Sequence, residues 1–398
     1  MKNVRKIIST ILALSMTAAL LAGCTISVDP TTGEVNVDTT QAEVDAVRGG
    51  GEVIDFPGNT AGDTEEDYAA YEPQLEYWTE GSPVKAEIEQ YVAEVTNPTS
   101  DKFIPVEDRI ACFDMDGTLI GELYPSYFEY MMFIHRALYD KNYKAPEDMK
   151  KFAKDLEEGI YTGDMPENHE RLHAKFAGQS YAGMTPDELK AYTKEFMNTE
   201  AEGFNNLTRG EAFYLPMVSL VNYLTANDFI CYIVSGSDRT IVRGIIEDTL
   251  PIPSNRIIGM SYSMVATGQD GKDGLDYLYA PEDDVVLGGD LIIKTIKMNK
   301  VSQIALEIGK VPVLAFGNSS GDLSMAQYAK SNKNYEGKAF MVLCDDTERE
   351  LGKPDKAASL KKTCDELGFT TISMRDDFAT IYGDDVTIVK EESEEKAS

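Results

Sequence analysis

The sequence predicts an α/β protein with a doubly wound, parallel, Rossmann-like sheet and an inserted helical cap domain. Three observations lead to this prediction. Four short apolar segments have the length and composition of strands that are buried on both faces. Helical patterns precede the later three segments, as expected for a parallel sheet. The connection between the first two strands, residues 119–228, is far longer than an ordinary crossover.

The four apolar segments define the expected strands. They span residues 109–114, 229–235, 311–316 and 339–343. The helical patterns that precede the last three segments span 217–227, 297–308 and 323–331. In a sheet of this kind ligands bind beyond the carboxyl ends of the strands, so functional residues are expected directly after these segments.

The long connection is the expected cap. Residues 119–228 are rich in helix formers, most clearly over 147–159 and 186–197, and contain few β-branched runs. Residues 77–118 and 229–390 are assigned to the core, and 391–398 to an acidic tail. A second insertion, 259–289, is rich in Gly, Asp and Tyr and predicts an irregular hairpin or flap.

The N-terminus has the pattern of a secretory signal over residues 1–23. Basic residues precede an apolar run from Ile7 to Leu21, which is too short for a comfortable membrane span. The following Leu21-Ala22-Gly23-Cys24 resembles the bacterial lipoprotein box, which implies cleavage before Cys24 and a lipid on that cysteine. The protein is then expected outside the cytoplasm, lipid-anchored to the bacterial cell membrane. The alternative is an ordinary signal peptide with an incidental cysteine.

Residues 24–76 predict an acidic, disordered tether. From Cys24 to Glu80 the chain has fourteen Asp or Glu residues and one Arg, so it can bury little apolar surface. The net charge of −31 argues against nucleic acid or an anionic membrane surface as a partner, since both attract basic patches. The later cysteines form no tight framework, and Cys112, Cys231 and Cys344 lie in apolar segments, so no structural disulfide is expected.

The motif Asp114-Met115-Asp116-Gly117-Thr118 directly follows the first strand. Because of this motif and its position, the sequence resembles the phosphatases of the haloacid dehalogenase superfamily. Phosphate-ester hydrolysis gives each part of this motif a role. A carboxylate that attacks an anionic phosphate needs a divalent cation between the two negative charges. Asp114 is the expected nucleophile, and Asp116 can protonate the leaving alcohol and then activate water. The alternative is a solvated turn after a strand.

The resemblance implies further substrate-binding residues. At the end of the second strand, Ser235 and the Gly236 backbone are expected to bind the phosphoryl group, together with Thr118 of the first motif. Arg239, one turn into the next helix, can reach an anion. The alternatives are a helix cap for Ser-Gly-Ser and a surface role for Arg239.

A lysine is expected to offset the negative charge of the nucleophile and the phosphate. The sequence around Lys300 best matches the corresponding pattern of the superfamily, and Lys300 is preferred to Lys297. The two residues lie about one helical turn apart, so Lys297 remains the main competitor.

The resemblance places a Mg²⁺ site at residues 317–322, after the third strand. The expected ligands are Asp114, the Asp116 carbonyl and Asp322. Asn318 departs from the commonest pattern, in which an Asp stands there, and is expected to contact the metal directly or through water. The resemblance extends to 345–350 and 372–377, so it covers most of residues 78–382 and is weakest across the cap. At the entry to the cap, Glu122 could recognise a cationic group of a substrate; the alternative is a solvated glutamate at the start of a helix.

Residues 169–173 spell His-Glu-x-x-His, the pattern of a zinc peptidase helix. The central Arg171 argues against this function, because a cation beside the metal weakens metal binding. We expect His169 and His173 to be incidental residues of a cap helix.

These observations predict a Mg²⁺-dependent phosphomonoester hydrolase that acts on a small phosphorylated metabolite through an aspartyl phosphate. A large cap that closes over the site should exclude polymers. The alternative is a solute-binding lipoprotein of the same fold that lacks catalytic activity. The sequence does not identify the ester or the oligomeric state.

Overall fold

The structure is a computed structural model that describes residues 25–28, 35–38 and 73–389. The chain divides into two compact units, residues 1–69 and 70–398. The signal peptide, the lipid-bearing Cys24, most of the tether and the tail at 391–398 were predicted for residues that lie outside the described ranges.

Two short strands occur within the segment expected to be disordered. Strand β1 (Thr25–Val28) pairs antiparallel with β2 (Val35–Asp38). The prediction of disorder is therefore wrong for these eight residues. The prediction considered only the acidic composition of the segment, whereas β-branched residues at most of these positions favour an extended backbone.

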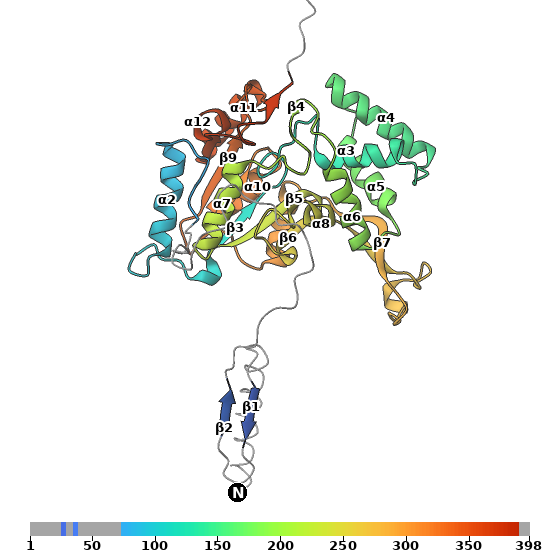
Figure 1. The fold of residues 1–398 in the computed structure, drawn as a ribbon, viewed down its shortest axis with the longest axis horizontal. Helices are drawn as coiled ribbons and strands as arrows, with labels where there is room; N and C mark the ends of the chain where they lie inside the picture. The colour runs from blue at the N-terminus through green and yellow to red at the C-terminus, as the bar shows by residue number, and fades with distance from the viewer. Residues whose placement is uncertain (1–24, 29–34, 39–72, 390–398) are drawn as a thin grey trace, which may run out of the picture. The chain divides into compact units, whose positions relative to one another are not determined.

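The second unit is built on a seven-stranded sheet with the order β10-β9-β8-β3-β5-β6-β7 (Figure 1). All neighbouring strands are parallel except β6 and β7. The predicted doubly wound α/β fold is confirmed. The strands are β3 (Ile110–Phe113), β5 (Ile230–Asp238), β6 (Ile257–Ala266), β7 (Val285–Ile293), β8 (Leu314–Gly317), β9 (Lys338–Leu343) and β10 (Thr370–Ser373).

Helices cover both faces of this sheet. Along β3, Ile110 and Cys112 belong to a cluster that includes Ile304, whereas Ala111 and Phe113 belong to the main core cluster. This alternation is expected for a strand buried on both sides. The core helices are α2 (Pro83–Thr96), α7 (Leu215–Ala226), α8 (Arg239–Ile246), α9 (Met298–Glu307), α10 (Leu323–Lys330), α11 (Pro354–Leu367) and α12 (Met374–Asp377).

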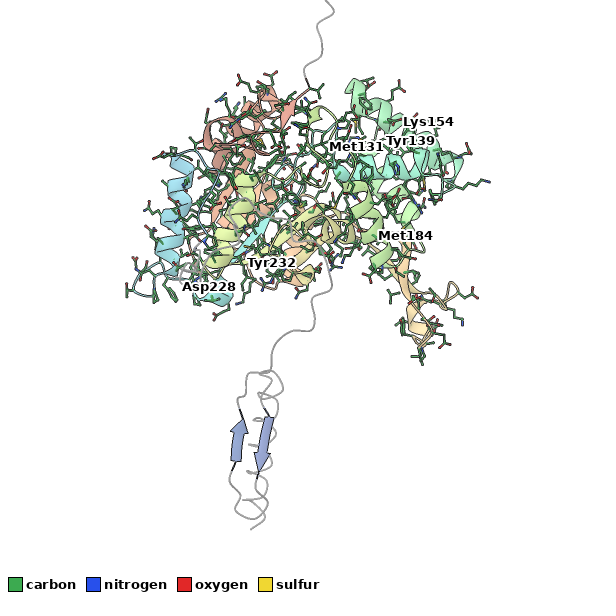
Figure 2. The ribbon with its side chains drawn as sticks, in the orientation of Figure 1. Met131, Tyr139, Lys154, Met184, Asp228 and Tyr232 are labelled. Carbon is green, nitrogen blue, oxygen red and sulfur yellow. The ribbon has the colours of Figure 1, made fainter. Side chains whose placement is uncertain are left out.

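The connection between β3 and β5 carries the expected helices. They are α3 (Phe128–Ile134), which continues as a π-helical turn at His135–Tyr139, α4 (Glu147–Thr162), α5 (His169–Tyr181) and α6 (Pro186–Met197). Figure 2 shows Met131, Tyr139 and Lys154 together on this part of the molecule, away from Asp228 and Tyr232 near the start of β5. A short strand, β4 (Phe204–Asn205), follows and pairs with β11 (Thr387–Ile388).

The last helix of the expected cap segment packs with the core instead. Helix α7 contacts β5. The Trp78 indole donates a hydrogen bond to the Pro216 carbonyl (2.9 Å), and the Ser219 hydroxyl donates one to the Glu76 carbonyl (2.7 Å). The apolar character of α7, with few polar positions, explains why it is buried against β5 and residues 76–78.

The second insertion forms a hairpin, as predicted. Strands β6 and β7 pair antiparallel, and in Figure 1 their distal ends extend away from the sheet. The two strands extend beyond the predicted insertion at both ends, because β6 begins at Ile257 and β7 ends at Ile293. The hairpin also packs on the cap, since the Tyr262 hydroxyl donates a hydrogen bond to the Ala174 carbonyl of α5 (2.8 Å).

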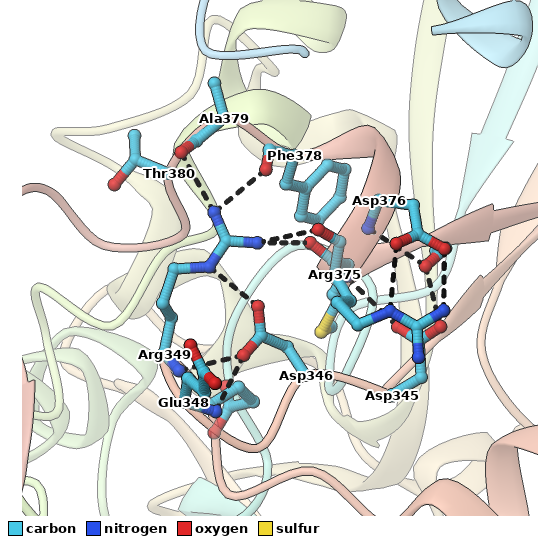
Figure 3. A network of polar contacts seen from close by, with 12 residues as sticks. Asp345, Asp346, Glu348, Arg349, Arg375, Asp376, Phe378, Ala379 and Thr380 are labelled. Carbon is cyan, nitrogen blue, oxygen red and sulfur yellow. Dashed lines mark hydrogen bonds and ion pairs between the residues drawn. The ribbon is translucent and has the colours of Figure 1, made fainter.

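Two sequence segments far apart in the chain are joined by Arg349 (Figure 3). Its guanidinium donates to the Asp346 carboxylate (2.7 Å). It also donates to four backbone carbonyls at 2.9–3.1 Å, those of Met374, Arg375, Phe378 and Ala379. The loop after β9 is therefore fixed to the segment that follows β10.

Candidate active site

The loop that follows β3 presents two carboxylates at the carboxyl end of the sheet. The Asp114 amide donates to the Phe316 carbonyl of neighbouring β8 (2.8 Å), which fixes the start of the loop. Gly117 has a φ of +77° and donates to the Ile120 carbonyl (2.7 Å). A residue with a side chain would be strained at this φ, so the glycine allows the turn that carries Asp116 back over the strand.

Lys300 lies between two buried carboxylates. Its ammonium is 2.5 Å from Asp114 Oδ1 and 2.6 Å from Asp322 Oδ1, and it donates to the Val234 carbonyl (2.6 Å). Only 1% of Lys300 is exposed. Lys300 is therefore the lysine that contacts Asp114, although Lys297 also lines the cavity. Lys297 is exposed and lies one residue before α9, with a φ of +53°.

The charges of Asp114, Lys300 and Asp322 influence one another strongly. Burial, together with the nearby Asp322, raises the pKa of Asp114 to about 7 even though Lys300 opposes the shift. Burial acts to lower the pKa of Lys300, but Asp114 and Asp322 outweigh it and hold that pKa above its usual range. The lysine is therefore a permanent cation beside the expected nucleophile.

Asp116 is oriented by a serine that was not among the predicted site residues. The Ser237 hydroxyl donates to Asp116 Oδ2 (2.8 Å). Burial raises the pKa of Asp116, although the hydrogen bond from Ser237 opposes the shift. A raised pKa favours a carboxyl group that must carry a proton at one stage of a reaction. The second serine of Ser235-Gly236-Ser237 was the available signal for this residue.

The expected phosphate-binding segment is only partly placed in the site. Gly236 and Ser237 line the cavity that contains Asp114. Ser235 is fully buried, and its hydroxyl accepts a hydrogen bond from the Ser237 amide (3.0 Å). The cap of α8 is Asp238, whose carboxylate accepts from the Thr240 and Ile241 amides. Ser235 therefore supports the segment, while its two successors face the cavity.

Two further predictions are wrong in position. The Arg239 guanidinium donates to the Ser261 hydroxyl (3.0 Å) and forms a bidentate ion pair with Glu307, so it points away from the cavity. As the first residue of α8, it lies beyond the cap at Asp238 and is directed to the helix surface. Thr118 is fully buried, and its hydroxyl contacts Asn318 Oδ1 at 3.5 Å, so it supports the site from behind.

Asp322 holds the loop after β8 as well as Lys300. Its Oδ2 accepts from the amides of Asn318 (3.1 Å) and Ser319 (3.0 Å) and from the Ser319 hydroxyl (3.0 Å). Its Oδ1 contacts Lys300. Asp322 therefore shapes the loop and orients the lysine, and it lines the same cavity as Asn318.

Glu122 and Asn318 meet above Gly117. A Cβ atom at Gly117 would overlap Asn318 Nδ2 and lie 2.7 Å from Glu122 Oε2. Burial, with smaller contributions from Asp116 and Asp114, raises the pKa of Glu122 to about 8, although Asn318 opposes the shift by hydrogen bonding. Glu122 therefore supplies a carboxyl group next to the asparagine that replaces the usual aspartate.

These side chains surround a cavity of about 220 Å³. Cap residues contribute to its wall, including Tyr127, Tyr130 and the buried Glu129. Lys294 was one of several candidate lysines in the sequence, whereas the sequence gave no indication of Glu129. Glu129 Oε1 is buried without a hydrogen-bond partner in the described part of the chain, and burial raises its pKa to about 8. Neither residue belongs to a recognisable motif, so only the fold brings them to the site.

His169 and His173 both lie near the Tyr130 ring, with 6.3 and 4.3 Å between the ring centroids. The His173 ring is fully buried, and its centroid is 5.4 Å from that of Phe133. His169 Nδ1 contacts the Pro166 carbonyl (3.0 Å), and His135 contacts the Tyr192 hydroxyl (3.0 Å). The burial of His173 among aromatic rings argues against a zinc peptidase. The four cysteines in the described ranges are free, as predicted.

The donor groups at the site suit a hard divalent cation. Oxygen atoms of Asp114, Asp116, Asn318 and Glu122 line one cavity, and the ammonium of Lys300 contacts only the first of these. Among the described residues, no three His, Cys, Asp or Glu side chains converge as a complete ligand set. Mg²⁺ needs fewer protein side chains, because it retains waters and accepts carbonyl ligands.

The comparisons with known proteins assign no function to this site. No protein-family profile and no curated protein matches the chain. A protein of unknown function from Bordetella pertussis Tohama I matches 66% of this chain and 97% of its own, at 16% identity and a TM-score of 0.42. Cytosolic 5'-nucleotidase IIIB bound to cytidine matches 73% and 85%, at 13% identity and a TM-score of 0.44.

A phosphoserine phosphohydrolase-like protein from Francisella tularensis subsp. tularensis SCHU S4 is also similar. It matches 63% of this chain and 92% of its own, at 17% identity and a TM-score of 0.35. Similarities this low transfer no activity, so any function rests on the residues described above.

No helix in the described ranges has the length and apolar character needed to cross a membrane.

Proposed function

We propose that this protein is a Mg²⁺-dependent phosphomonoester hydrolase of the haloacid dehalogenase type. The observation that carries the proposal is the placement of Asp114, Asp116 and Lys300 around one cavity at the carboxyl ends of the strands. A carboxylate nucleophile, a second carboxyl group with a raised pKa and a permanent cation are the parts that hydrolysis through an aspartyl phosphate requires.

Each residue has a defined part in the proposed reaction. Asp114 attacks phosphorus, the bond to the leaving oxygen breaks, and Asp116 gives its proton to the departing alcohol. Asp116 then takes a proton from water, which attacks the phosphorus of the aspartyl phosphate and releases inorganic phosphate and free Asp114. Lys300 holds Asp114 in position and offsets its charge, and Ser237 keeps the Asp116 carboxyl oriented.

Bound Mg²⁺ would offset the repulsion between the Asp114 carboxylate and the phosphate. Asp114, the Asp116 carbonyl, Asp322 and Asn318 are the residues that would hold the ion. Asp322 also supports the loop that carries Asn318, because its Oδ2 accepts from the amides of Asn318 and Ser319.

The direct test is phosphate release from a panel of phosphorylated metabolites with Mg²⁺. The expected result is turnover that stops with EDTA, returns with Mg²⁺ and falls by several orders of magnitude in Asp114→Asn. Turnover that persists in that variant or in EDTA would contradict the proposal. Binding of a phosphorylated ligand without turnover would support the alternative of a solute-binding protein. The intact pair of Asp116 and Ser237 speaks against that alternative, since a binding protein needs no proton donor.

The proposed location is outside the cytoplasm, with a lipid on Cys24. This part of the proposal rests on the signal-like N-terminus and the Leu21-Ala22-Gly23-Cys24 sequence. Metabolic labelling with a fatty acid tests it. The wild type should incorporate label and sediment with membranes, whereas Cys24→Ala should do neither.

A further inference from the structure

The catalytic cavity opens into a larger cleft between the cap and the core. This outer cleft has a volume of about 660 Å³ and shares Glu122, Tyr127, Tyr130 and Asn318 with the inner cavity. Pockets of roughly 300–1,000 Å³ typically hold drug-sized ligands, so the cleft is much larger than a phosphoryl group requires. A leaving group that departs from the inner cavity therefore has room to extend outward.

The middle of the outer cleft is lined by apolar side chains from both sides. The cap contributes Ile160 and Met165, together with Tyr127, which is 38% exposed and packs edge-on against Tyr130 with 5.3 Å between the ring centroids. The core contributes Leu323 and Leu360. Flat or aliphatic groups can be buried between these walls, because the lining is half-buried and apolar.

The charge of the outer cleft is opposite to that of the chain. The protein has 68 acidic and 37 basic residues, yet Glu122, which the cleft shares with the inner cavity, is the one carboxylate in the lining. Lys353 and Lys356 line the cleft on the core side, and within the described ranges neither is held by an ion pair. Two unpaired cations in an acidic protein favour an anionic group at this end.

We propose that the substrate is an elongated phosphate monoester with a second anionic group. Its scissile phosphate occupies the inner cavity, an apolar or aromatic part lies between Tyr127 and Leu360, and the second anion binds Lys353 and Lys356. This inference rests on the proposed function, and it replaces the expectation of a small metabolite with a more extended class of substrate.

The test compares three esters with the full chain and Mg²⁺: glycerol phosphate, naphthyl phosphate, and a naphthyl phosphate with a sulfonate on the far ring. The expected order of kcat/KM rises from the first to the third. Two exposed charge pairs together should increase kcat/KM by between about twofold and thirtyfold, and the gain expected from the sulfonate is in the middle of this range, about threefold to tenfold. Added salt should reduce this gain.

Variants assign the gain to the cleft. Lys353→Ala/Lys356→Ala should lose the gain from the sulfonate while hydrolysis of glycerol phosphate stays within about twofold of wild type. The matched control is Lys361→Ala/Lys362→Ala, on the same helix but outside the cleft lining, which should keep the gain. Equal rates with and without the sulfonate, or equal losses for all three esters, would overturn the inference.

A binding measurement separates this inference from the proposed function. The sulfonated naphthyl phosphonate, which cannot be hydrolysed, is titrated by calorimetry into the wild type and the double variant. If no ester is hydrolysed, the proposed function fails, but a threefold to tenfold weaker binding by the Lys353→Ala/Lys356→Ala variant would still support the cleft. Equal binding by the two proteins would refute the cleft inference whether or not the protein is a hydrolase.

Discussion

Removal of the Lys300 charge should destabilise the protein more than any other single substitution of a lysine at the site. Lys300→Met keeps most of the side-chain volume but leaves Asp114 and Asp322 buried without a cation. Asp114 is 7% exposed and Asp322 is 1% exposed, so solvent cannot replace the lysine. Breaking a buried ion pair by removal of one partner typically costs about 3–5 kcal/mol. For a folded unit of this size that corresponds to roughly 4–8 °C in Tm.

The assay is thermal unfolding of the metal-free protein at pH 8, above the pKa of about 7 of Asp114. Lys297→Met is the matched control, since Lys297 is exposed and has no ion pair in the described ranges; its Tm should change by less than about 2 °C. The triple charge cluster makes a second prediction. In the Lys300→Met background, Asp322→Asn should recover part of the loss, because it removes one of the two uncompensated charges.

A drop of less than about 2 °C for Lys300→Met, or an equal drop for Lys297→Met, would refute this reasoning. So would a further loss on adding Asp322→Asn. Either result would mean that the ammonium does not balance these carboxylates in the folded protein.

Three further predictions concern the turn, the Arg349 contacts and pH. Gly117→Ala should lower the free energy of unfolding by about 1–2 kcal/mol, because Gly117 has a φ of +77°, and should also reduce phosphate release. Gly81 has a φ of +79° with open space around it, so Gly81→Ala should lower stability alone. Equal phosphate release by the two variants would contradict this prediction. Arg349→Ala should lower the free energy of unfolding in urea by about 2–3 kcal/mol. The control Arg375→Ala, at an exposed arginine, should lower it by less than about 1 kcal/mol. Similar losses for the two variants would argue against the role of the carbonyl contacts. Burial raises the pKa of Glu122 from 4.5 to about 8, so the native state binds the proton of Glu122 more tightly than the unfolded state does. The Tm of the metal-free protein should therefore fall between about pH 5 and 8, and Mg²⁺ should raise Tm more at pH 8 than at pH 5. An equal effect of Mg²⁺ at both pH values would contradict this prediction.

The sequence was most informative where local patterns and chain order both apply. Each of the four predicted strands overlaps an observed strand, and helix α6 has the predicted bounds. Strand β10 was not predicted. It is short and contains three hydroxyl-bearing residues, Thr370, Thr371 and Ser373, so it lacks the apolar signal of a buried strand. Strands β6 and β7 were predicted as an irregular hairpin or flap, and the structure adds both of them to the edge of the sheet.

The site residues that could be predicted are those that the backbone directly after a strand holds in place. Asp114 and Asp116 lie where the motif places them, and Lys300 is close to its expected partner. Arg239 was misplaced because the strand continues through Ser237 to Asp238, which moves the helix start and turns the arginine toward Glu307. Glu129 and the outer cleft could not be predicted, because they depend on how the cap packs over the core.

The most direct test of the account is detection of a phosphoryl group on Asp114 during turnover. Asp116→Asn should slow hydrolysis of the aspartyl phosphate, because water then lacks its base. Acid-quenched samples of this variant with substrate and Mg²⁺ are digested and analysed by mass spectrometry. The account predicts one phosphoryl group on the peptide that contains Asp114, absent without Mg²⁺ and absent in Asp114→Asn. Phosphate release by the wild type with no adduct at Asp114, or an adduct on another residue, would contradict it.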